Sequence, residues 1–357
     1  MKKTLLLIAT LLASYVGMAQ ETYHPTAENL KAREQFQDEK FGIFLHWGLY
    51  SMMGTTEWIM TNRDINYKEY PKLAKTFYPS EFDADAWVKA IKAAGAKYIT
   101  ITTRHHDGFS LFKTATSTYN SVDGTPFKRD IIKEMADACQ RNGIKLHLYY
   151  SHLDWGREDY PVGRTGTGTG RPKEKANWAS YYKFMNTQLT ELLTNYGKVG
   201  AIWFDGWWDH DSDTKPFDWQ LEEQYAMIHK LQPQCLVANN HHHTPFPGED
   251  IQIFERDFPG ENKAGLSGQS IGRLPLESCQ TINEHWGYNI TDTLYKSPKE
   301  LIQMLVRAAG KNANLLLNIG PEPGGALPEL ALNRLQALGK WLNQYGETIY
   351  GTRGGIV

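Results

Sequence analysis

Short apolar runs of strand length alternate with amphipathic segments of helical length along most of this chain. Runs rich in aliphatic and aromatic residues predict strands near positions 41, 98, 145, 201, 235, 252, 278 and 314. Between most of them, apolar residues recur with helical spacing, which predicts helices over about 83–95, 129–142, 178–196, 220–231, 301–309 and 328–345. Asp83 is a good N-cap for the first of these helices, and Gly95 is a good C-terminal stop.

This alternation predicts an α/β fold with a parallel sheet. Eight strands with covering helices, in about 320 residues, fit an imperfect (β/α)8 TIM-like barrel. The stretches 239–251 and 256–277 are too short or too rich in Gly and Pro for good helices, so we expect the barrel to be irregular around strands five to seven. A doubly wound open sheet is the alternative, but no GxGxxG follows the first strand.

The first twenty residues differ from the rest of the chain. Lys2 and Lys3 precede an apolar run over 5–16, and small residues stand before a cut after Ala19. This pattern is typical of a secretory signal peptide, here 1–19, and the run is too short to span a membrane. We expect an exported bacterial protein, periplasmic or extracellular, with no membrane anchor after cleavage. An uncleaved anchor is the alternative.

The amino-acid composition excludes some classes of function. The formal charge of −2 becomes −4 when the two lysines of the leader are removed, so the chain has no general attraction for nucleic acid. Its three cysteines lie far apart, which predicts buried thiols rather than a disulfide framework or a metal site. Its 11 Trp, 19 Tyr and 14 Phe exceed what a core needs, and stacking surfaces for a ringed ligand are one use of the excess.

Polar and aromatic side chains gather where the predicted strands end. Active sites of (β/α)8 barrels lie at the C-terminal ends of the strands. Flat aromatic faces pack on the C–H groups of a sugar, and polar groups hydrogen-bond its hydroxyls, so this rim suits a carbohydrate. The residues at or beside these strand ends include His46, His105, His106, Tyr149, Trp203, Asp205, Glu255, Glu277 and Trp286.

Glycoside hydrolysis needs two carboxyl groups, one ionised and one protonated, on either side of the scissile bond. Asp205, at a strand end between tryptophans, is the candidate for the ionised group, and Glu255, two strands further on, is the candidate acid. Each has a plainer interpretation: Asp205 caps a helix or pairs with a cation, and Glu255 pairs with Arg256 at the surface. Glu277 braces a loop in the same plainer view. The joint occurrence on one rim favours catalysis.

Two further segments stand out. The Gly- and Thr-rich stretch 164–170 lacks the Lys-Ser/Thr pair of a phosphate-binding loop, so we expect a mobile surface loop. The tract 241–243, His-His-His, resembles a metal-binding sequence. Adjacent side chains point in different directions, however, so we expect no metal site there.

Six segments, in this order and spacing, resemble the α-L-fucosidases of glycoside hydrolase family 29. Together they cover nearly the whole chain after the leader, about residues 22–355. They are FGIFLHWG at 41–48, TRHHDGF at 103–109, LYYS at 148–151, IWFDG at 202–206, ESC at 277–279 with WGY at 286–288, and NLLLNIGP at 314–321.

The resemblance implies a retaining mechanism on fucosylated oligosaccharides or glycoconjugates, without metal or organic cofactor. It assigns the nucleophile to Asp205 and the acid/base to Glu255, with Glu277 as the alternative acid/base because another branch of the family aligns there. The two carboxyl groups are then expected about 5–5.5 Å apart. The sugar-holding residues implied by the resemblance are His46, Glu57, Trp58, His105, His106, Tyr149, Trp203 and Trp286.

The chain departs from the family pattern in two places. Many relatives carry an Arg after strand five, where this chain has Asn-Asn-His-His-His at 239–243, so the contact of that Arg is in doubt. Most relatives also have a β-sandwich after the barrel. Because this sequence stops at Val357, we expect 20–350 to form the catalytic domain, with that sandwich absent or truncated and 351–357 a linker.

Two other classes of function stay open on the sequence alone. The first is a lectin-like protein that binds fucose without cleaving it. The second is a metal-dependent hydrolase that uses the histidines.

Overall fold

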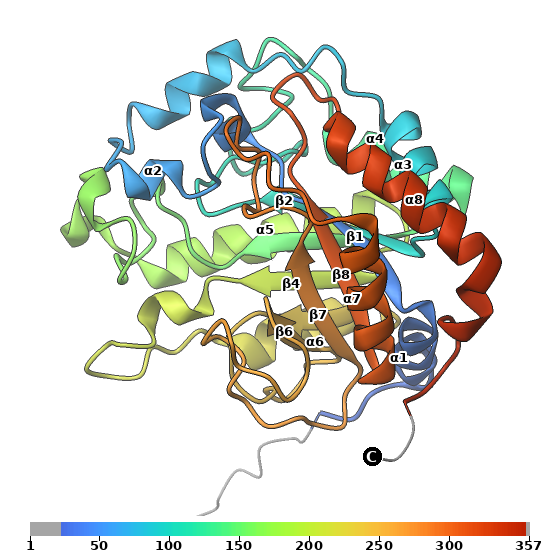
Figure 1. Cartoon of the computed structure of the whole chain (residues 1–357). Helices are drawn as coiled ribbons and strands as arrows, with labels where there is room; N and C mark the ends of the chain where they lie inside the picture. Colours follow the sequence, from blue (N-terminus) through green and yellow to red (C-terminus); the bar gives the residue numbers. More distant parts are fainter. Residues whose placement is uncertain (1–22, 355–357) are drawn as a thin grey trace, which may run out of the picture.

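Eight parallel strands form the centre of the fold in the computed structural model, which describes residues 23–354 (Figure 1). They lie in the order β5-β4-β3-β2-β1-β8-β7-β6, and only an isolated bridge between Ala238 and Ile251 joins β5 to β6. The result is a nearly closed (β/α)8 barrel, as predicted. The strands are β1 (Phe41–Leu45), β2 (Tyr98–Arg104), β3 (Lys145–Ser151), β4 (Ala201–Asp205), β5 (Leu236–Asn239), β6 (Gln252–Glu255), β7 (Leu276–Thr281) and β8 (Ala313–Ile319).

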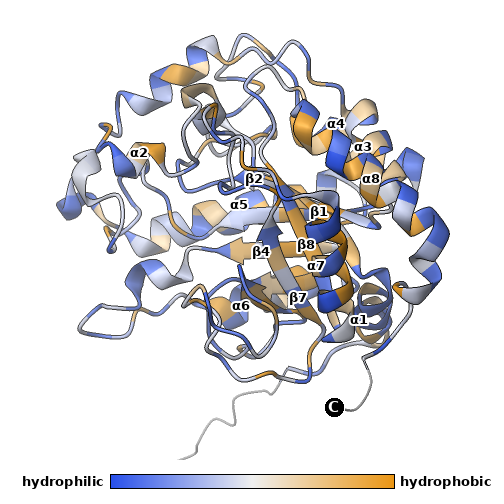
Figure 2. Cartoon of the chain, in the orientation of Figure 1, coloured by the Kyte–Doolittle hydropathy of each residue, from blue (hydrophilic) through white to orange (hydrophobic). Residues whose placement is uncertain are grey.

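Helices cover the outside of the barrel, and all six predicted helices are confirmed. Their apolar stripes face the strands, so the hydrophobic colour concentrates at the centre of the molecule (Figure 2). Asp83 caps the first of them by accepting from the backbone N–H of Ala86 at 2.9 Å. The six are α3 (Ala84–Ala93), α4 (Ile131–Asn142), α5 (Trp178–Asn195), α6 (Leu221–Leu231), α7 (Pro298–Gly310) and α8 (Glu329–Tyr345).

One long helix was not predicted. α1 (Ala27–Glu39) is mostly polar and has only two buried residues, so the apolar periodicity that reveals a surface helix is missing. Phe36 is the exception: its ring lies 5.3 Å from that of Tyr98 and 6.0 Å from that of His147. α1 therefore closes the N-terminal end of the barrel with a single aromatic side chain. The short α2 (Ile59–Asn62) lies at the opposite rim, in the long connection after β1.

The barrel is irregular where the sequence predicts it. No helix covers the connections 240–251 and 256–275 in this part of the structure. Loops after β5 and β6 replace those helices, and each loop begins at the end of the barrel where the strands finish. This irregularity brings additional polar side chains to the C-terminal rim.

The remaining features concern the ends of the chain and its thiols. The predicted leader 1–19 lies outside the described residues, and none of the helices within 23–354 is long and apolar enough to cross a membrane. Near the C-terminus, Arg353 forms an ion pair with Asp38 of α1 at 2.8 Å. The three cysteines are buried and unpaired, as predicted.

Candidate active site

A pocket of about 190 Å³ opens at the C-terminal ends of the strands. It contains every residue of the predicted sugar site except His106 and Glu277. Its walls are Phe44, His46, Glu57, Trp58, His105, Tyr149, Arg164, Trp203, Asp205, Trp208, Asn240, His242, Glu255, Leu266, Cys279 and Trp286.

Asp205 is the last residue of β4, and four donors converge on its carboxylate. The Tyr149 hydroxyl donates to Oδ2 at 3.0 Å. The Trp208 indole and the backbone N–H of Gly206 donate to Oδ1 at 3.0 and 2.8 Å, and the amide of Asn240 approaches the same oxygen at 3.4 Å. Only 14 % of the side chain is exposed. These contacts fix one carboxylate at the pocket floor in a single orientation.

Glu255 ends β6 and faces Asp205 across the pocket. The amide nitrogen of Asn240 donates to Glu255 Oε2 at 2.7 Å and lies 3.4 Å from Asp205 Oδ1. Because one nitrogen makes both contacts, the two oxygens are at most about 6.1 Å apart, the sum of these distances. Inverting glycosidases hold their carboxyl groups about 6.5–9.5 Å apart, and retaining enzymes about 5–5.5 Å. The separation favours the retaining geometry.

The two carboxyl groups share one buried environment. Burial, together with the charge of Glu255, raises the pKa of Asp205 to about 6. Burial also acts to raise the pKa of Glu255, but the hydrogen bond and charge of His242, with the Asn240 amide, outweigh it, so the net shift is downward. Asp205 therefore has the higher pKa of the two. Such a pair loses its protons as a unit.

Glu277 lies beneath the pocket rather than on its wall. It is the second residue of β7 and is fully buried. Its two oxygens accept from the Tyr98 hydroxyl at 2.7 Å and from the Trp203 indole at 2.8 Å. Burial raises its pKa to about 7. The side chain therefore orients the indole of Trp203, which lies on the pocket wall.

His46 is held in one tautomer. The Asn318 amide nitrogen donates to the carbonyl of Trp286 at 2.7 Å, so the amide oxygen faces His46 Nδ1, 2.6 Å away. Nδ1 must then carry the hydrogen, and Nε2 presents a lone pair on the pocket side. Burial lowers the pKa of His46 to about 3, so the ring stays neutral. It is a hydrogen-bond acceptor for a hydroxyl.

A bulge at the end of β2 carries the two adjacent histidines. The register of β2 with β3 shifts between Thr102 and Arg104, immediately before His105 and His106. Ser151 donates its hydroxyl to a carbonyl and so accepts from Nδ1 of His106 at 2.7 Å. Nε2 of His106 then presents a lone pair 3.5 Å from Asp205 Oδ2. Burial lowers the pKa of both histidines, so both rings stay neutral.

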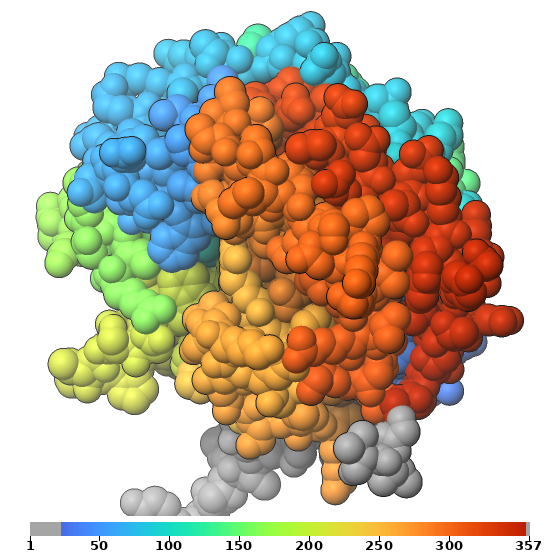
Figure 3. All heavy atoms as spheres, in the orientation of Figure 1, coloured from blue at the N-terminus to red at the C-terminus, as the bar shows by residue number. Residues whose placement is uncertain are grey.

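Another part of the pocket wall comes from distant parts of the chain. Glu57, in the connection after β1, accepts from the backbone N–H of Gly287 at 2.9 Å through Oε2. In the part of the chain that the structure describes, its Oε1 has no partner and faces the pocket. Trp58 stacks on Trp208 with ring centroids 5.5 Å apart. On the surface, the segment near Glu57 (blue) adjoins the segment near Gly287 (orange) (Figure 3).

The three consecutive histidines have three different environments. His241 is buried against Glu249 at 3.0 Å, His242 points to Glu255 at 2.9 Å, and His243 packs edge-on to Trp207. Adjacent side chains diverge, as expected. Within residues 23–354, no three His, Cys, Asp or Glu side chains are arranged to hold a metal ion.

The stretch 164–170 differs from the expected mobile loop because it is tied to the rim. The backbone N–H and hydroxyl of Thr165 donate to Asp209 at 2.8 and 2.6 Å, and Gly166 N–H donates to Thr61 at 3.0 Å. The guanidinium of Arg164 lies 5.1 Å from the ring of Trp208, at the mouth of the pocket. This loop is therefore part of the site, although its Gly-rich composition did not indicate it.

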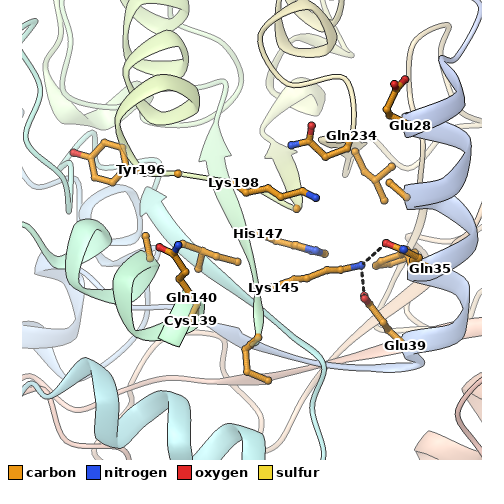
Figure 4. Close-up of a pocket in the computed structure, with 18 of the residues that line it drawn as sticks. Glu28, Gln35, Glu39, Cys139, Gln140, Lys145, His147, Tyr196, Lys198 and Gln234 are labelled. Atoms are coloured by element: carbon orange, nitrogen blue, oxygen red, sulfur yellow. Dashed lines mark hydrogen bonds and ion pairs between the residues drawn. The ribbon is translucent and has the colours of Figure 1, made fainter. Parts of the chain in front are cut away.

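A larger cavity of about 670 Å³ lies at the other end of the barrel (Figure 4). It opens between α1 and the first residues of β3, where Lys145 bonds Glu39 and Gln35 at 2.5 and 3.4 Å. His147 and Lys198 also border it. Barrel enzymes do not place their chemistry at this end, and the carboxyl pair is absent from its walls. The smaller pocket is therefore the candidate site.

Sequence reasoning did not assign a role to several wall residues. Asn240 and His242 follow β5 directly, so their place at a strand end was the available signal. Phe44 and Cys279 lie within strands, and Leu266 lies in a long loop, where position along the chain gives no such signal.

Comparisons with known proteins agree on one family. A sequence model described as alpha-L-fucosidase matches residues 10–347. The plasma alpha-L-fucosidase of Rattus norvegicus is 31 % identical over 380 residues, which cover 98 % of this chain and 77 % of the relative.

Solved structures give the same result. Alpha-L-fucosidase isoenzyme 1 from Paenibacillus thiaminolyticus superposes with a TM-score of 0.82 at 36 % identity, over 92 % of this chain and 79 % of that one. A mutant of alpha-L-fucosidase AlfC from Lactobacillus casei, in complex with Fuca(1,6)GlcNAc, superposes with a TM-score of 0.75 at 29 % identity, over 88 % of this chain and 99 % of that one.

Proposed function

The chain belongs to the alpha-L-fucosidase family of glycoside hydrolases, and on that premise we propose that it is an exo-acting, retaining enzyme that releases terminal α-L-fucose from fucosylated glycans. The observation that carries this proposal is the opposition of Asp205 and Glu255 across the pocket, with the facing oxygens at most about 6.1 Å apart. Both residues are placed by strand ends, which hold them rigidly.

In the first step, Asp205 attacks C1 of the fucoside and the bond to the leaving oxygen breaks. Glu255 gives its proton to that oxygen, and a fucosyl ester forms on Asp205. In the second step, Glu255 takes a proton from water, and the resulting hydroxide displaces Asp205 from C1. Two inversions retain the anomeric configuration. No metal or cofactor is required by this scheme, because the two carboxyl groups supply nucleophile, acid and base.

The proposal also explains how the proton reaches Glu255. A sugar hydroxyl donates a hydrogen bond to Asp205 Oδ2, the oxygen that lies 3.5 Å from His106 Nε2. A hydrogen bond to the ionised form of Asp205 lowers its pKa, so substrate moves the proton of the pair toward Glu255. His46 Nε2 and Glu57 Oε1 accept from other hydroxyls, and the tryptophans of the wall pack on the C6 methyl group.

Release of 4-nitrophenol from 4-nitrophenyl α-L-fucoside tests the proposed activity. The first product seen by proton NMR should be the α-anomer of fucose, which shows retention. Binding of fucose without release would instead identify a lectin-like protein. Loss of turnover in the presence of a chelator would identify a metal-dependent hydrolase. First formation of the β-anomer would reject the double displacement.

The pH dependence follows from the shared proton. The reactive state holds one proton on the pair, and the higher pKa of the pair is about 6, raised by burial and mutual repulsion. A raised pKa means that the proton is lost as pH rises through that value, so kcat/KM falls above about pH 6. Profiles measured with a disaccharide between about pH 4 and pH 9 check this expectation. A flat profile to the basic end would contradict it.

We also propose that the protein is exported. The support is the charged, apolar and small-residue succession of 1–19. N-terminal sequencing of protein secreted by an expressing bacterium should begin at Gln20. A first residue of Met1 in a membrane fraction would identify an uncleaved anchor.

A further inference from the structure

Glu255 is held asymmetrically by its neighbours. Both donors that reach its carboxyl group, the amide of Asn240 at 2.7 Å and Nε2 of His242 at 2.9 Å, reach the same oxygen, Oε2. Within residues 23–354, Oε1 has no hydrogen-bond partner, and the side chain lies on the pocket wall with 15 % of its surface exposed. The two oxygens of one carboxyl group are thus chemically distinct.

The backbone fixes both donors. The N–H of Asn240 donates to the carbonyl of Phe204 in β4 at 2.9 Å, which anchors the amide between the two carboxylates. Its side-chain nitrogen must face them, since the oxygen would be repelled by both. His242 has a φ of 67°, a left-handed conformation that is rare for a residue with a side chain. Conformations of this kind gather at functional sites.

His241 explains how that conformation is maintained. One of its ring nitrogens contacts Glu249 at 3.0 Å, and the other accepts from the backbone N–H of His243 at 3.0 Å. The residues on either side of His242 are therefore fixed, and its ring is directed at Glu255. The catalytic steps of Asp205 and Glu255 assign no role to the histidines at 241–243.

We propose that His242, together with Asn240, is a positioning residue that holds Oε2 of Glu255 as the accepting oxygen and leaves Oε1 to carry and donate the proton. The proposal deepens the proposed function and rests on it. When Glu255 is protonated, Oε2 is its carbonyl oxygen and accepts both N–H groups, while the Oε1 hydroxyl points into the pocket. The proton passes from Oε1 to the leaving oxygen, and later from water to Oε1, so Oε2 keeps its donors throughout.

The same donors make Glu255 a stronger acid, because they favour its ionised form. The other groups that face it are Asp205 from β4, Arg256 next in the chain, Cys279 of β7 and His46, the residue after β1. Arg256 lowers the pKa of Glu255 and stays in place when His242 is replaced, whereas His242 lowers the pKa of Asp205, which sets the basic limb, as well as that of Glu255. Removal of the imidazole should therefore move the pKa of Glu255 upward.

The variant His242→Phe tests this, since it keeps the ring and removes the N–H. We expect the basic limb of the kcat/KM profile to move up by about one pH unit. Turnover of a disaccharide, which needs a strong acid, should fall about tenfold, and turnover of 4-nitrophenyl α-L-fucoside much less. His242→Gln, which restores an N–H donor, should bring the limb back toward that of the wild type. His243→Phe, a neighbour that does not face Glu255, is the matched control.

An unmoved limb in His242→Phe, or equal losses on both substrates, would overturn the proposal and leave a structural role. NMR of 13C-labelled glutamate carboxyl groups, with Glu255→Gln to assign the signal, reports the same pKa without turnover. This measurement tests the role of His242 even if the protein cleaves no α-L-fucoside. Absence of cleavage would contradict only the proposed function.

Discussion

Replacement of Asp205 by Asn is expected to lower kcat/KM by at least about 10⁴-fold while the fold persists. The amide cannot attack C1, yet it has the same shape and can still accept from the Trp208 indole, which lies 3.0 Å from the present carboxylate. Turnover of 4-nitrophenyl α-L-fucoside measures the loss. Asp205→Ala, whose side chain cannot revert to Asp by deamidation, should show the same loss of kcat/KM.

The same substitution is expected to raise the thermal stability. Burial raises the pKa of Asp205 from 3.8 to about 6, so the folded state binds this proton more tightly than the unfolded chain. Stability from such a group is present at low pH and is lost as pH rises through about 6, so the ionised carboxylate is a cost at pH 7. Asp205→Asn removes that cost, and its melting temperature at pH 7 should exceed that of the wild type. Glu34→Gln, at an exposed carboxylate of α1, is the control, with activity and melting temperature unchanged.

Glu255→Ala is expected to show the second-largest effect, about 10²–10⁴-fold on a disaccharide, because the leaving oxygen loses its acid. On 4-nitrophenyl α-L-fucoside the first step needs little acid, so the fucosyl ester accumulates and its hydrolysis limits the rate. Azide needs no general base and should restore turnover, with fucosyl azide of retained configuration as the product. Asp205→Ala with azide should instead give the inverted fucosyl azide, which separates the two roles.

Glu277→Ala separates Glu255 from the alternative acid/base. Its loss leaves the Tyr98 hydroxyl and the Trp203 indole, both buried, without an acceptor, which costs about 1–3 kcal/mol for each donor. We expect a lower melting temperature and weaker substrate binding, with no response to azide. Rescue of Glu277→Ala by azide, without rescue of Glu255→Ala, would reverse the assignment.

Local sequence was sufficient for the elements of the barrel. Most strands are apolar runs, and helices such as α3 have a clear apolar stripe with a capping Asp83, so pattern and structure agree. The sequence did not predict α1, because this helix contributes one apolar side chain, Phe36, to the core. A single tertiary contact of this kind leaves no apolar periodicity in the sequence. The Gly-rich loop at 164–170 escaped prediction because composition does not reveal that Asp209 holds it.

The difference between Glu255 and Glu277 shows where local sequence reasoning ends. Both were expected on one rim, Glu255 at the end of a predicted strand and Glu277 just before the next one, and the family resemblance allowed either as the acid. In the structure Glu255 is the last residue of β6 and Glu277 the second of β7, paired with Asn314 rather than with a rim residue. The position of a residue along its strand decides whether its side chain reaches the pocket or the barrel interior. An error of a few residues in a predicted strand boundary therefore changes the predicted location.

The order of strands, their covering helices and the placement of Asp205 at a strand end were determined by the sequence itself, because periodicity and capping act between near neighbours. The arrangement around the carboxyl pair was decided only by the tertiary structure. Asn240 reaches two strands at once, His242 turns to Glu255 through a left-handed backbone, and Glu57 meets Gly287, 230 residues away. Contacts of this kind depend on barrel closure, which brings together residues that no local pattern connects.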